Sequence, residues 1–204
     1  MDAFWSCQLV LKRHLSNGLE IGVYKGAFVT LILDNLDFTR VVGIDPYPGL
    51  PHIRSVMESE CSNFLKVARF CLLEDLESIP KEEKFDFIHI DGEHSEEAIR
   101  KDITVSFSKL NDGGLIIIDD FMSRMFPGLT AQIILIAYQL CLKPVLITEY
   151  KIYLVKEADY SSYRDDIFEI SKTFETGENG IYHNGVYGES YVQNGEILGV
   201  NAYV

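Results

Sequence analysis

The chain has 204 residues, which is enough for one full-sized domain. Apolar residues make up 47% of it and charged residues 24%, so the composition excludes an intrinsically disordered or collagen-like chain. The 31 acidic residues outnumber the 18 basic ones and give a net charge of −13. Because such a surface repels a phosphate backbone, the charge argues against a nucleic-acid partner.

The cysteines and the apolar segments indicate where the protein resides. Cys7, Cys61, Cys71 and Cys141 are scattered without a Cys-x-x-Cys pair, which favours a reducing compartment. The first residues lack the pattern of a secretory signal, and the apolar run near Ile133 is too short to span a bilayer. We therefore expect a soluble, cytoplasmic protein that has no membrane partner.

Strand and helix patterns alternate along most of the chain. Helical spacing predicts helices over 2–15, 27–36, 53–68, 95–110 and 129–142, and short apolar runs predict strands over 19–21, 40–44, 70–73, 85–90, 115–118, 145–148 and 152–155. The inner strands are apolar without a period of two, which is typical of a parallel, doubly wound α/β sheet with helices on both faces. The last two strands read as a hairpin that adds an antiparallel edge strand.

The pattern changes near residue 161. Asn-Gly dipeptides at 184–185 and 194–195 are strong hairpin signals, and they predict a three-stranded meander over 179–204. Such a meander is too small to be stable alone. We therefore predict a main domain over 1–160 and a β-rich C-terminal extension over 161–204, which packs on that domain or on another subunit of a homo-oligomer.

A glycine-containing turn follows the first predicted strand. It begins at Glu20, and glycines at 22 and 26 would let the backbone approach a ligand before the next helix begins. Tyr24 stands where the dinucleotide fingerprint needs a glycine, which disfavours a nicotinamide oxidoreductase. The spacing suits a nucleoside, and Asp45 at the end of the second strand could accept hydrogen bonds from both ribose hydroxyls. A plain tight turn is the competing interpretation.

Acidic residues follow the next two inner strands. Asp91 comes after the strand over 85–90, and Asp119 and Asp120 come after the strand over 115–118. Because neighbouring strand ends lie about 5 Å apart, three carboxylates would converge there, and a divalent cation with oxygen ligands such as Mg²⁺ would offset their repulsion. Ordinary solvated strand ends are the alternative. His94 is placed to act as a general base near neutral pH.

Four segments together resemble a known family. Residues 19–26 (LEIGVYKG), 43–45 (GID), 85–94 (FDFIHIDGEH) and 113–121 (GGLIIIDDF) are similar to class I S-adenosylmethionine-dependent methyltransferases. More narrowly, they resemble the branch that contains macrolide-sugar and aminocoumarin-sugar O-methyltransferases. The resemblance covers about residues 18–156. It implies a Rossmann-like methyltransferase that acts on a small hydroxylated, sugar-like acceptor.

The resemblance also implies roles for individual residues. The amino-acid and ribose parts of S-adenosylmethionine are expected to contact Glu20, Gly22, Tyr24 and Gly26. Asp45 is expected to bind the ribose hydroxyls, and Glu74 and Asp75 are expected to contact the adenine. Mg²⁺ is expected to bind Asp91, Asp119 and Asp120, with Asp91 shared by the cofactor-binding, metal-binding and catalytic sets. His94 is the implied base. The metal would bind two adjacent acceptor oxygens and favour the alkoxide.

A second class of function stays open at this point: a non-catalytic or degenerate methyltransferase fold that serves binding or assembly. The tyrosines of the extension motivate it, because aromatic residues are enriched at interfaces; they are Tyr182, Tyr187, Tyr191 and Tyr203. Their packing onto the chain's own domain is the competing explanation. Deletion of 177–204 followed by sizing discriminates the two, since an unchanged oligomeric state removes the assembly role.

Overall fold

A computed structural model describes residues 2–46 and 70–172, together with five short strands within residues 175–203. The helix predicted over 53–68 lies outside the described residues, as do the side chains of Tyr182, Tyr187, Tyr191 and Tyr203.

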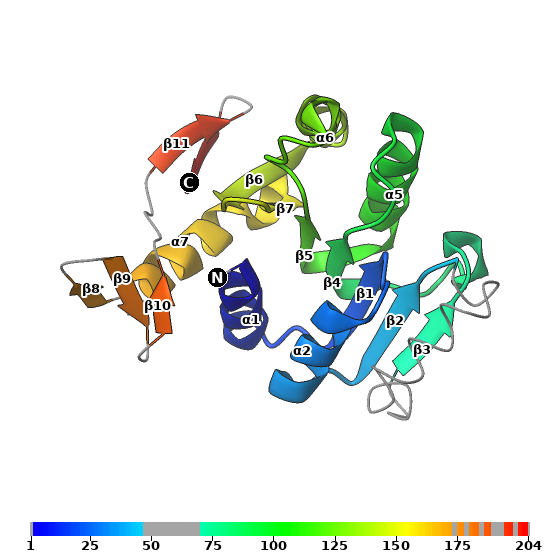
Figure 1. Ribbon diagram of the computed structural model, residues 1–204, viewed down its shortest axis with the longest axis horizontal. Coiled ribbons are helices and arrows are strands. Elements are labelled where there is room, and N and C mark those ends of the chain that lie inside the picture. Colours follow the sequence, from blue (N-terminus) through cyan, green and yellow to red (C-terminus); the bar gives the residue numbers. More distant parts are fainter. Residues whose placement is uncertain are drawn as a thin grey trace.

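A parallel sheet forms the centre of the molecule (Figure 1). Its strands are β1 (Asn17–Ile21), β2 (Arg40–Ile44), β3 (Phe70–Leu73), β4 (Phe85–Ile90) and β5 (Leu110–Ile118). They pair in parallel in the order β3-β2-β1-β4-β5. The strand order reverses between β1 and β4, and in such sheets ligands bind at that switch point, outside the carboxyl ends of the strands.

Two more strands continue the sheet beyond β5. They are β6 (Leu142–Ile147) and β7 (Ile152–Lys156), and β7 pairs antiparallel with both β5 and β6. The predicted doubly wound, mostly parallel fold class is therefore confirmed. The predicted hairpin forms, but β7 lies inside the sheet because four of its five residues are buried apolar side chains. Strand β12 (Val200–Tyr203) pairs in parallel with β6, and β11 (Asn194–Ile197) forms the outer edge.

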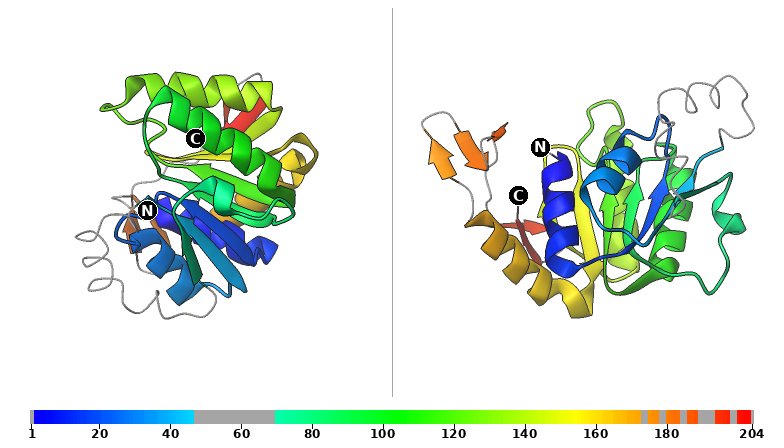
Figure 2. Two further views of the ribbon diagram at one scale, coloured as in Figure 1. Left: turned by 90° about the vertical axis from the view of Figure 1, so that its right-hand side faces the viewer. Right: turned by 90° about the horizontal axis from the view of Figure 1, so that it is seen from below.

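Helices cover both faces of the sheet (Figures 1 and 2). On one face lie α1 (Asp2–Arg13), α2 (Ala27–Asn35) and α7 (Tyr160–Ser171), and on the other lie α5 (Glu96–Lys109) and α6 (Pro127–Gln139).

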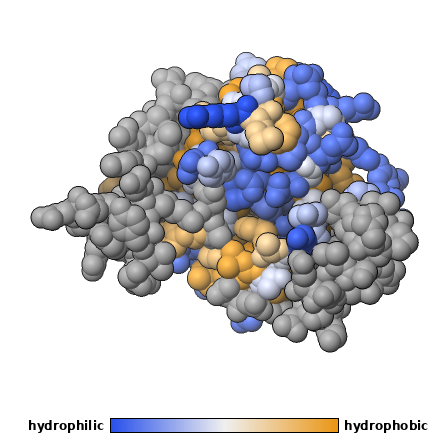
Figure 3. Space-filling view, in the orientation of Figure 1, coloured by the Kyte–Doolittle hydropathy of each residue, from blue (hydrophilic) through white to orange (hydrophobic). Residues whose placement is uncertain are grey.

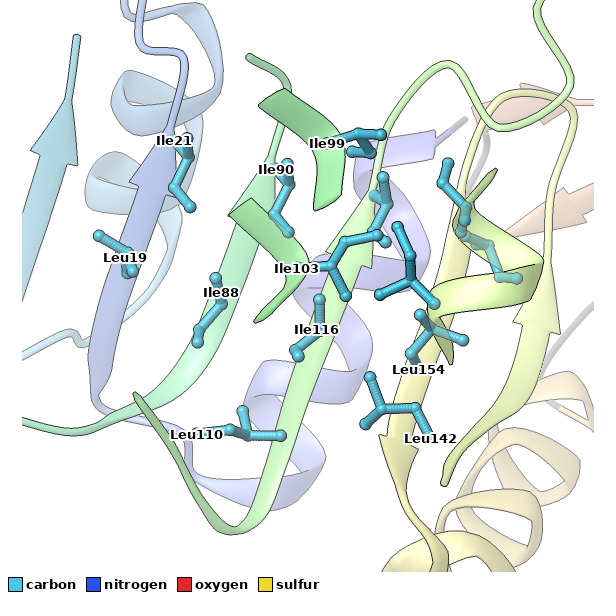
Figure 4. Close-up of a cluster of buried hydrophobic side chains, with 14 of the residues drawn as sticks. Leu19, Ile21, Ile88, Ile90, Ile99, Ile103, Leu110, Ile116, Leu142 and Leu154 are labelled. Carbon is cyan, nitrogen blue, oxygen red and sulfur yellow. The ribbon is translucent and has the colours of Figure 1, made fainter. Parts of the chain in front are cut away.

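Alternate residues of each strand supply the two cores. Figure 4 shows the core beneath α5 and α6, where Ile88 and Ile116 of the sheet lie below Ile103 of α5. Ser95 caps α5 as its sequence position suggested, because its hydroxyl oxygen accepts a hydrogen bond from the backbone N–H of Ala98.

The C-terminal region corrects part of the predicted organisation. Residues 161–171, which the sequence placed in the β-rich extension, belong to helix α7, whose buried residues Tyr163, Ile167 and Ile170 follow a helical spacing. The predicted meander over 179–204 is also divided. Strands β8 (Glu175–Gly177), β9 (Gly180–His183) and β10 (Val186–Gly188) form a small antiparallel sheet of their own.

The two Asn-Gly signals have different outcomes. The dipeptide at 184–185 lies between β9 and β10, as predicted. The dipeptide at 194–195 begins strand β11 instead, and the pairing of Ile197 with Val200 places the chain reversal after it. The last two strands thereby form a hairpin that joins the main sheet.

Candidate active site

The turn between β1 and α2 lies directly against the end of β4. Gly22 has φ +87°, and its backbone N–H donates to the carbonyl oxygen of Ile44 over 2.9 Å. A Cβ atom at this position would lie 2.0 Å from the carbonyl oxygen of Asp91. Only glycine fits here, and the turn that the sequence singled out is therefore tightly joined to the strand end that carries Asp91.

The same turn is tied to Asp45 at the end of β2. The backbone N–H of Tyr24 donates to Oδ2 of Asp45 over 2.7 Å, and Asp45 is only 2% exposed. The backbone of Tyr24 is left-handed, with φ +45°, and its side chain is exposed. The structure thus brings together Tyr24 and Asp45, two residues for which the sequence predicted a shared nucleoside ligand.

Glu20 is buried below this turn. Its Oε1 lies 3.5 Å from Nδ1 of His89, and among the described residues neither this nitrogen nor Oε2 of Glu20 has a hydrogen-bond partner. Burial raises the pKa of Glu20. A buried carboxylate oxygen without a partner is costly, and a donor from a ligand would satisfy it.

Lys151, in the turn between β6 and β7, was missed by the sequence analysis. It is 5% exposed, its ammonium contacts Oδ2 of Asp119, and its Nζ lies 3.1 Å from Nε2 of His89. Although burial opposes ionisation, the positive charge and the hydrogen bond of Lys151 hold the pKa of Asp119 well below its ordinary value. The available signals were a basic residue directly before an apolar strand, Lys151, and a histidine inside another apolar strand, His89.

Three of the residues predicted from the sequence lie close together next to Asp119. Single ligand atoms of Asp91, His94 and Asp120 all lie within 4.8 Å of one another. Nε2 of His94 is 2.8 Å from Oδ2 of Asp120, and the imidazole stacks on the ring of Phe126 with centroids 4.1 Å apart. Partial loss of hydration and the charge of nearby Asp119 raise the pKa of Asp91. We call Asp91, His94 and Asp120 the rim cluster.

Backbone geometry separates the two adjacent aspartates. Asp120 adopts a left-handed conformation with φ +56°, and its N–H donates to Oδ1 of Asp119 over 2.9 Å. The Asp119 carboxylate is directed to Lys151, and the Asp120 carboxylate to His94. A strained residue of this kind often marks a functional site.

The remaining predicted residues follow β3. Asp75 accepts hydrogen bonds from the N–H and the hydroxyl of Ser78, both over 2.8 Å, and so caps a short 3-10 helix, η2 (Leu76–Ser78). Glu74 is exposed beside it. Their contact with an adenine stays a prediction.

Figure 3 shows hydrophilic residues gathered in the middle of one face, over the region of β1, β4 and β5, with hydrophobic residues below them over α2.

Asp102 of α5 lies beside the loop that carries Asp91 and His94, and its pKa makes the stability of the fold depend on pH. A Cβ atom at Gly92 would lie 3.1 Å from its Oδ2, and burial raises the pKa of Asp102 from 3.8 to about 6. Because the folded chain binds this proton more tightly than the unfolded chain, the stabilisation is complete below pH 3.8 and is lost as the pH rises through about 6.

We therefore expect Asp102→Asn to raise the free energy of unfolding by about 3 kcal/mol at pH 8 and to leave it unchanged near pH 4. Urea unfolding of both proteins at the two pH values measures the difference. An equal effect at both pH values would contradict this assignment.

Comparisons with known proteins identify the family of the chain. A family model described as a methyltransferase domain matches residues 19–121, which contain the glycine turn, Asp45 and the rim cluster. The chain belongs to this methyltransferase family, and the family predicted from the sequence is confirmed.

Solved structures with the same fold are similar at low identity. One is a Podospora anserina methyltransferase bound to S-adenosylhomocysteine (SAH), with 15% identity over 75% of this chain and 76% of that one and a TM-score of 0.60. A putative caffeoyl-CoA O-methyltransferase from Staphylococcus aureus has 16% identity over 75% and 81%, with a TM-score of 0.58. An O-methyltransferase from Bacillus cereus in complex with SAH has 20% identity over 74% and 79%, with a TM-score of 0.56.

A curated relative is an uncharacterized protein of Acanthamoeba polyphaga mimivirus, 24% identical over 113 residues. The match covers 50% of this chain and 50% of that protein, so the chain spans about half the length of this relative. Among the described residues, no helix is both long and apolar enough to cross a membrane.

Proposed function

We propose that this chain binds S-adenosylmethionine and transfers its methyl group to a hydroxyl oxygen of a small, sugar-like acceptor. One observation carries the proposal. The backbone of Gly22, in the turn suited to a nucleoside, abuts the backbone of Asp91, whose side chain belongs to the rim cluster. A donor in the turn and an acceptor at the cluster would therefore lie side by side, and positioning of this kind supplies much of the rate of a direct displacement.

The residues present fit the proposed cofactor. Glu20 offers a buried carboxylate oxygen that lacks a partner among the described residues, which suits the ammonium of the methionine part. Gly22 lacks the side chain that would block close approach, and Asp45, which already accepts from the N–H of Tyr24 in this turn, is the proposed acceptor for the ribose hydroxyls. Glu74 and Asp75 are the proposed contacts to the adenine. When bound, S-adenosylmethionine supplies an electrophilic methyl group on a sulfonium.

His94 is the proposed base. Its Nε2–H would donate to Asp120, which leaves Nδ1 to accept the proton of the acceptor hydroxyl. Asp120 then orients the imidazole and stabilises the imidazolium that forms. The flat stacking on Phe126, with 3° between the ring planes, holds the imidazole in one orientation.

A divalent cation fits part of the predicted ligand set. The carboxylates of Asp91 and Asp120 face one another across the rim cluster, whereas the charge of Asp119 is already paired with Lys151. Mg²⁺ is bound by few carboxylates together with waters and substrate oxygens, so Asp91 and Asp120 suffice as its protein ligands. When bound, the cation would hold two adjacent oxygens of the acceptor and lower the pKa of the one that is methylated.

Calorimetric titration of EDTA-treated protein with Mg²⁺ tests the metal. We expect one site in the wild type that Asp91→Asn weakens by about tenfold or more, because one of two anionic ligands is lost. Glu93→Gln, an exposed neighbour outside the cluster, is the matched control and should bind Mg²⁺ as the wild type does. Equal binding by all three proteins would contradict a metal at this cluster.

The function itself is tested by transfer of a labelled methyl group from S-adenosylmethionine to a panel of vicinal diols, both sugars and catechols. The proposal predicts an ether product with at least one diol, and it predicts that Asp45→Asn removes this activity. Transfer to nitrogen or carbon acceptors but to no hydroxyl would contradict O-methylation.

A further inference from the structure

Four buried or half-buried polar side chains form a continuous chain beneath the proposed site. Asp119 contacts Lys151, Nζ of Lys151 lies 3.1 Å from Nε2 of His89, and Nδ1 of His89 lies 3.5 Å from Oε1 of Glu20. They come from the ends of β5, β4 and β1 and from the turn before β7. The chain therefore connects the strand end that carries the rim cluster to the proposed cofactor site.

The aromatic ring of Phe28 covers one side of this row of polar side chains. The ring of Phe28 stacks on the imidazole of His89 with centroids 3.9 Å apart, and Nζ of Lys151 lies 5.5 Å from the centroid of the same ring. The side chains of His89 and Lys151 are 1% and 6% exposed. Hydrogen bonds in such a dry setting are strong, and a wrongly placed proton is costly.

The contact between Lys151 and His89 determines which imidazole nitrogen carries the proton. An ammonium can only donate, so Nε2 of His89 must accept from Lys151. A doubly protonated imidazolium would set two donors against each other at 3.1 Å. The single ring proton therefore resides on Nδ1, which faces Glu20.

We infer that Lys151 is a positioning residue that holds His89 in its Nδ1–H tautomer and so directs one oxygen of Glu20 to His89 and the other to the cofactor ammonium. The second half of this inference rests on the proposed function. Without the ammonium of Lys151, the ring proton of His89 would reside on Nε2 and would be directed toward Asp119, whose Oδ2 is 3.8 Å away. A bare Nδ1 lone pair would then face the Glu20 carboxylate, and Glu20 would lose its orientation.

Nitrogen NMR of the ligand-free protein at neutral pH tests the tautomer directly. Two-bond and three-bond correlations of ¹⁵N-labelled histidine distinguish the two neutral tautomers and the imidazolium. We expect the Nδ1–H form for His89 in the wild type, the same form in Lys151→Gln, whose amide can still donate, and the Nε2–H form in Lys151→Met. Lys156→Met, at the far end of β7, is the control and should keep the wild-type signal, because Lys156 bonds to Leu110 and Asp112 instead.

The wild-type spectrum decides the first half of the inference even where a variant does not fold. An Nε2–H tautomer or an imidazolium at His89 would overturn it, and so would an unchanged tautomer in folded Lys151→Met.

SAH titration of the same proteins tests the second half. We expect Lys151→Met to weaken SAH binding by about tenfold or more, since the hydrogen bond between Glu20 and the SAH ammonium is lost. Lys151→Gln should bind SAH at least about threefold more tightly than Lys151→Met. Wild-type binding with equal affinity in Lys151→Met would overturn the positioning role while the proposed function survives. Absence of wild-type binding would contradict the proposed function, and the tautomer would still be measured.

Discussion

Replacement of Gly22 by alanine is expected to lower the free energy of unfolding by about 3 kcal/mol or more. The residue has φ +87°, which costs a residue with a Cβ about 1–2 kcal/mol. The new methyl group would also lie 2.0 Å from the carbonyl oxygen of Asp91, so the ends of β1 and β4 must separate. Urea unfolding followed by circular dichroism measures the loss.

Gly113→Ala is the matched control for this substitution. Gly113 has a similar φ of +75°, but a Cβ there meets nothing within 4 Å. Its variant should therefore lose only the conformational part, about 1–2 kcal/mol. Equal losses of unfolding free energy in the two variants would show that the close contact of Gly22 with the end of β4 does not contribute. The proposed link between the glycine turn and the rim cluster would then be wrong.

Replacement of His94 by glutamine is expected to lower kcat for methyl transfer by about 10²–10⁴-fold, because general-base catalysis contributes that much. The affinity for SAH should stay within about twofold, since the partners of His94 are Asp120 of the rim cluster and the ring of Phe126. Turnover of any diol methylated by the wild type, together with an SAH titration, separates the two effects.

Asp120→Asn should also lower kcat, because the asparagine side chain has the shape of aspartate but lacks the charge that stabilises the imidazolium of His94. Asparagine also tolerates the left-handed backbone at φ +56°, so this variant is expected to fold. A variant of either residue with wild-type kcat would remove the base from the proposed mechanism.

The fold was predictable because its strongest signals are local. The apolar runs at 40–44, 85–90 and 115–118 are typical of buried parallel strands, and acidic residues at their ends predicted where chemistry would gather. Helix α7 was missed because its exposed face carries many polar residues and only Tyr163, Ile167 and Ile170 are buried. The dipeptide at 194–195 misled because a turn signal does not decide which residues pair, and pairing with β12 placed it in a strand.

The proximity of the rim-cluster residues was predictable, but their partners were not. Asp91 and Asp120 were expected to lie close together because neighbouring parallel strands bring their ends together, and His94 follows Asp91 by three residues. The three predicted metal ligands were treated as equivalent, yet the left-handed backbone of Asp120 sends the two adjacent carboxylates to different partners. Lys151 reaches Asp119 only because β7 lies between β5 and β6, and that non-local pairing leaves no mark in a local pattern.

The central claim is that the glycine turn and Asp45 bind S-adenosylmethionine. The most direct test is calorimetric titration of the whole chain with SAH, run with Mg²⁺ and again with EDTA, beside Asp45→Asn. We predict binding of the wild type at micromolar concentrations under both conditions, and a loss of about 100-fold in the variant, since two hydrogen bonds to a charged acceptor are weakened. Absence of wild-type binding under both conditions would contradict the assignment of this turn as the cofactor site, and with it the proposed methyl transfer.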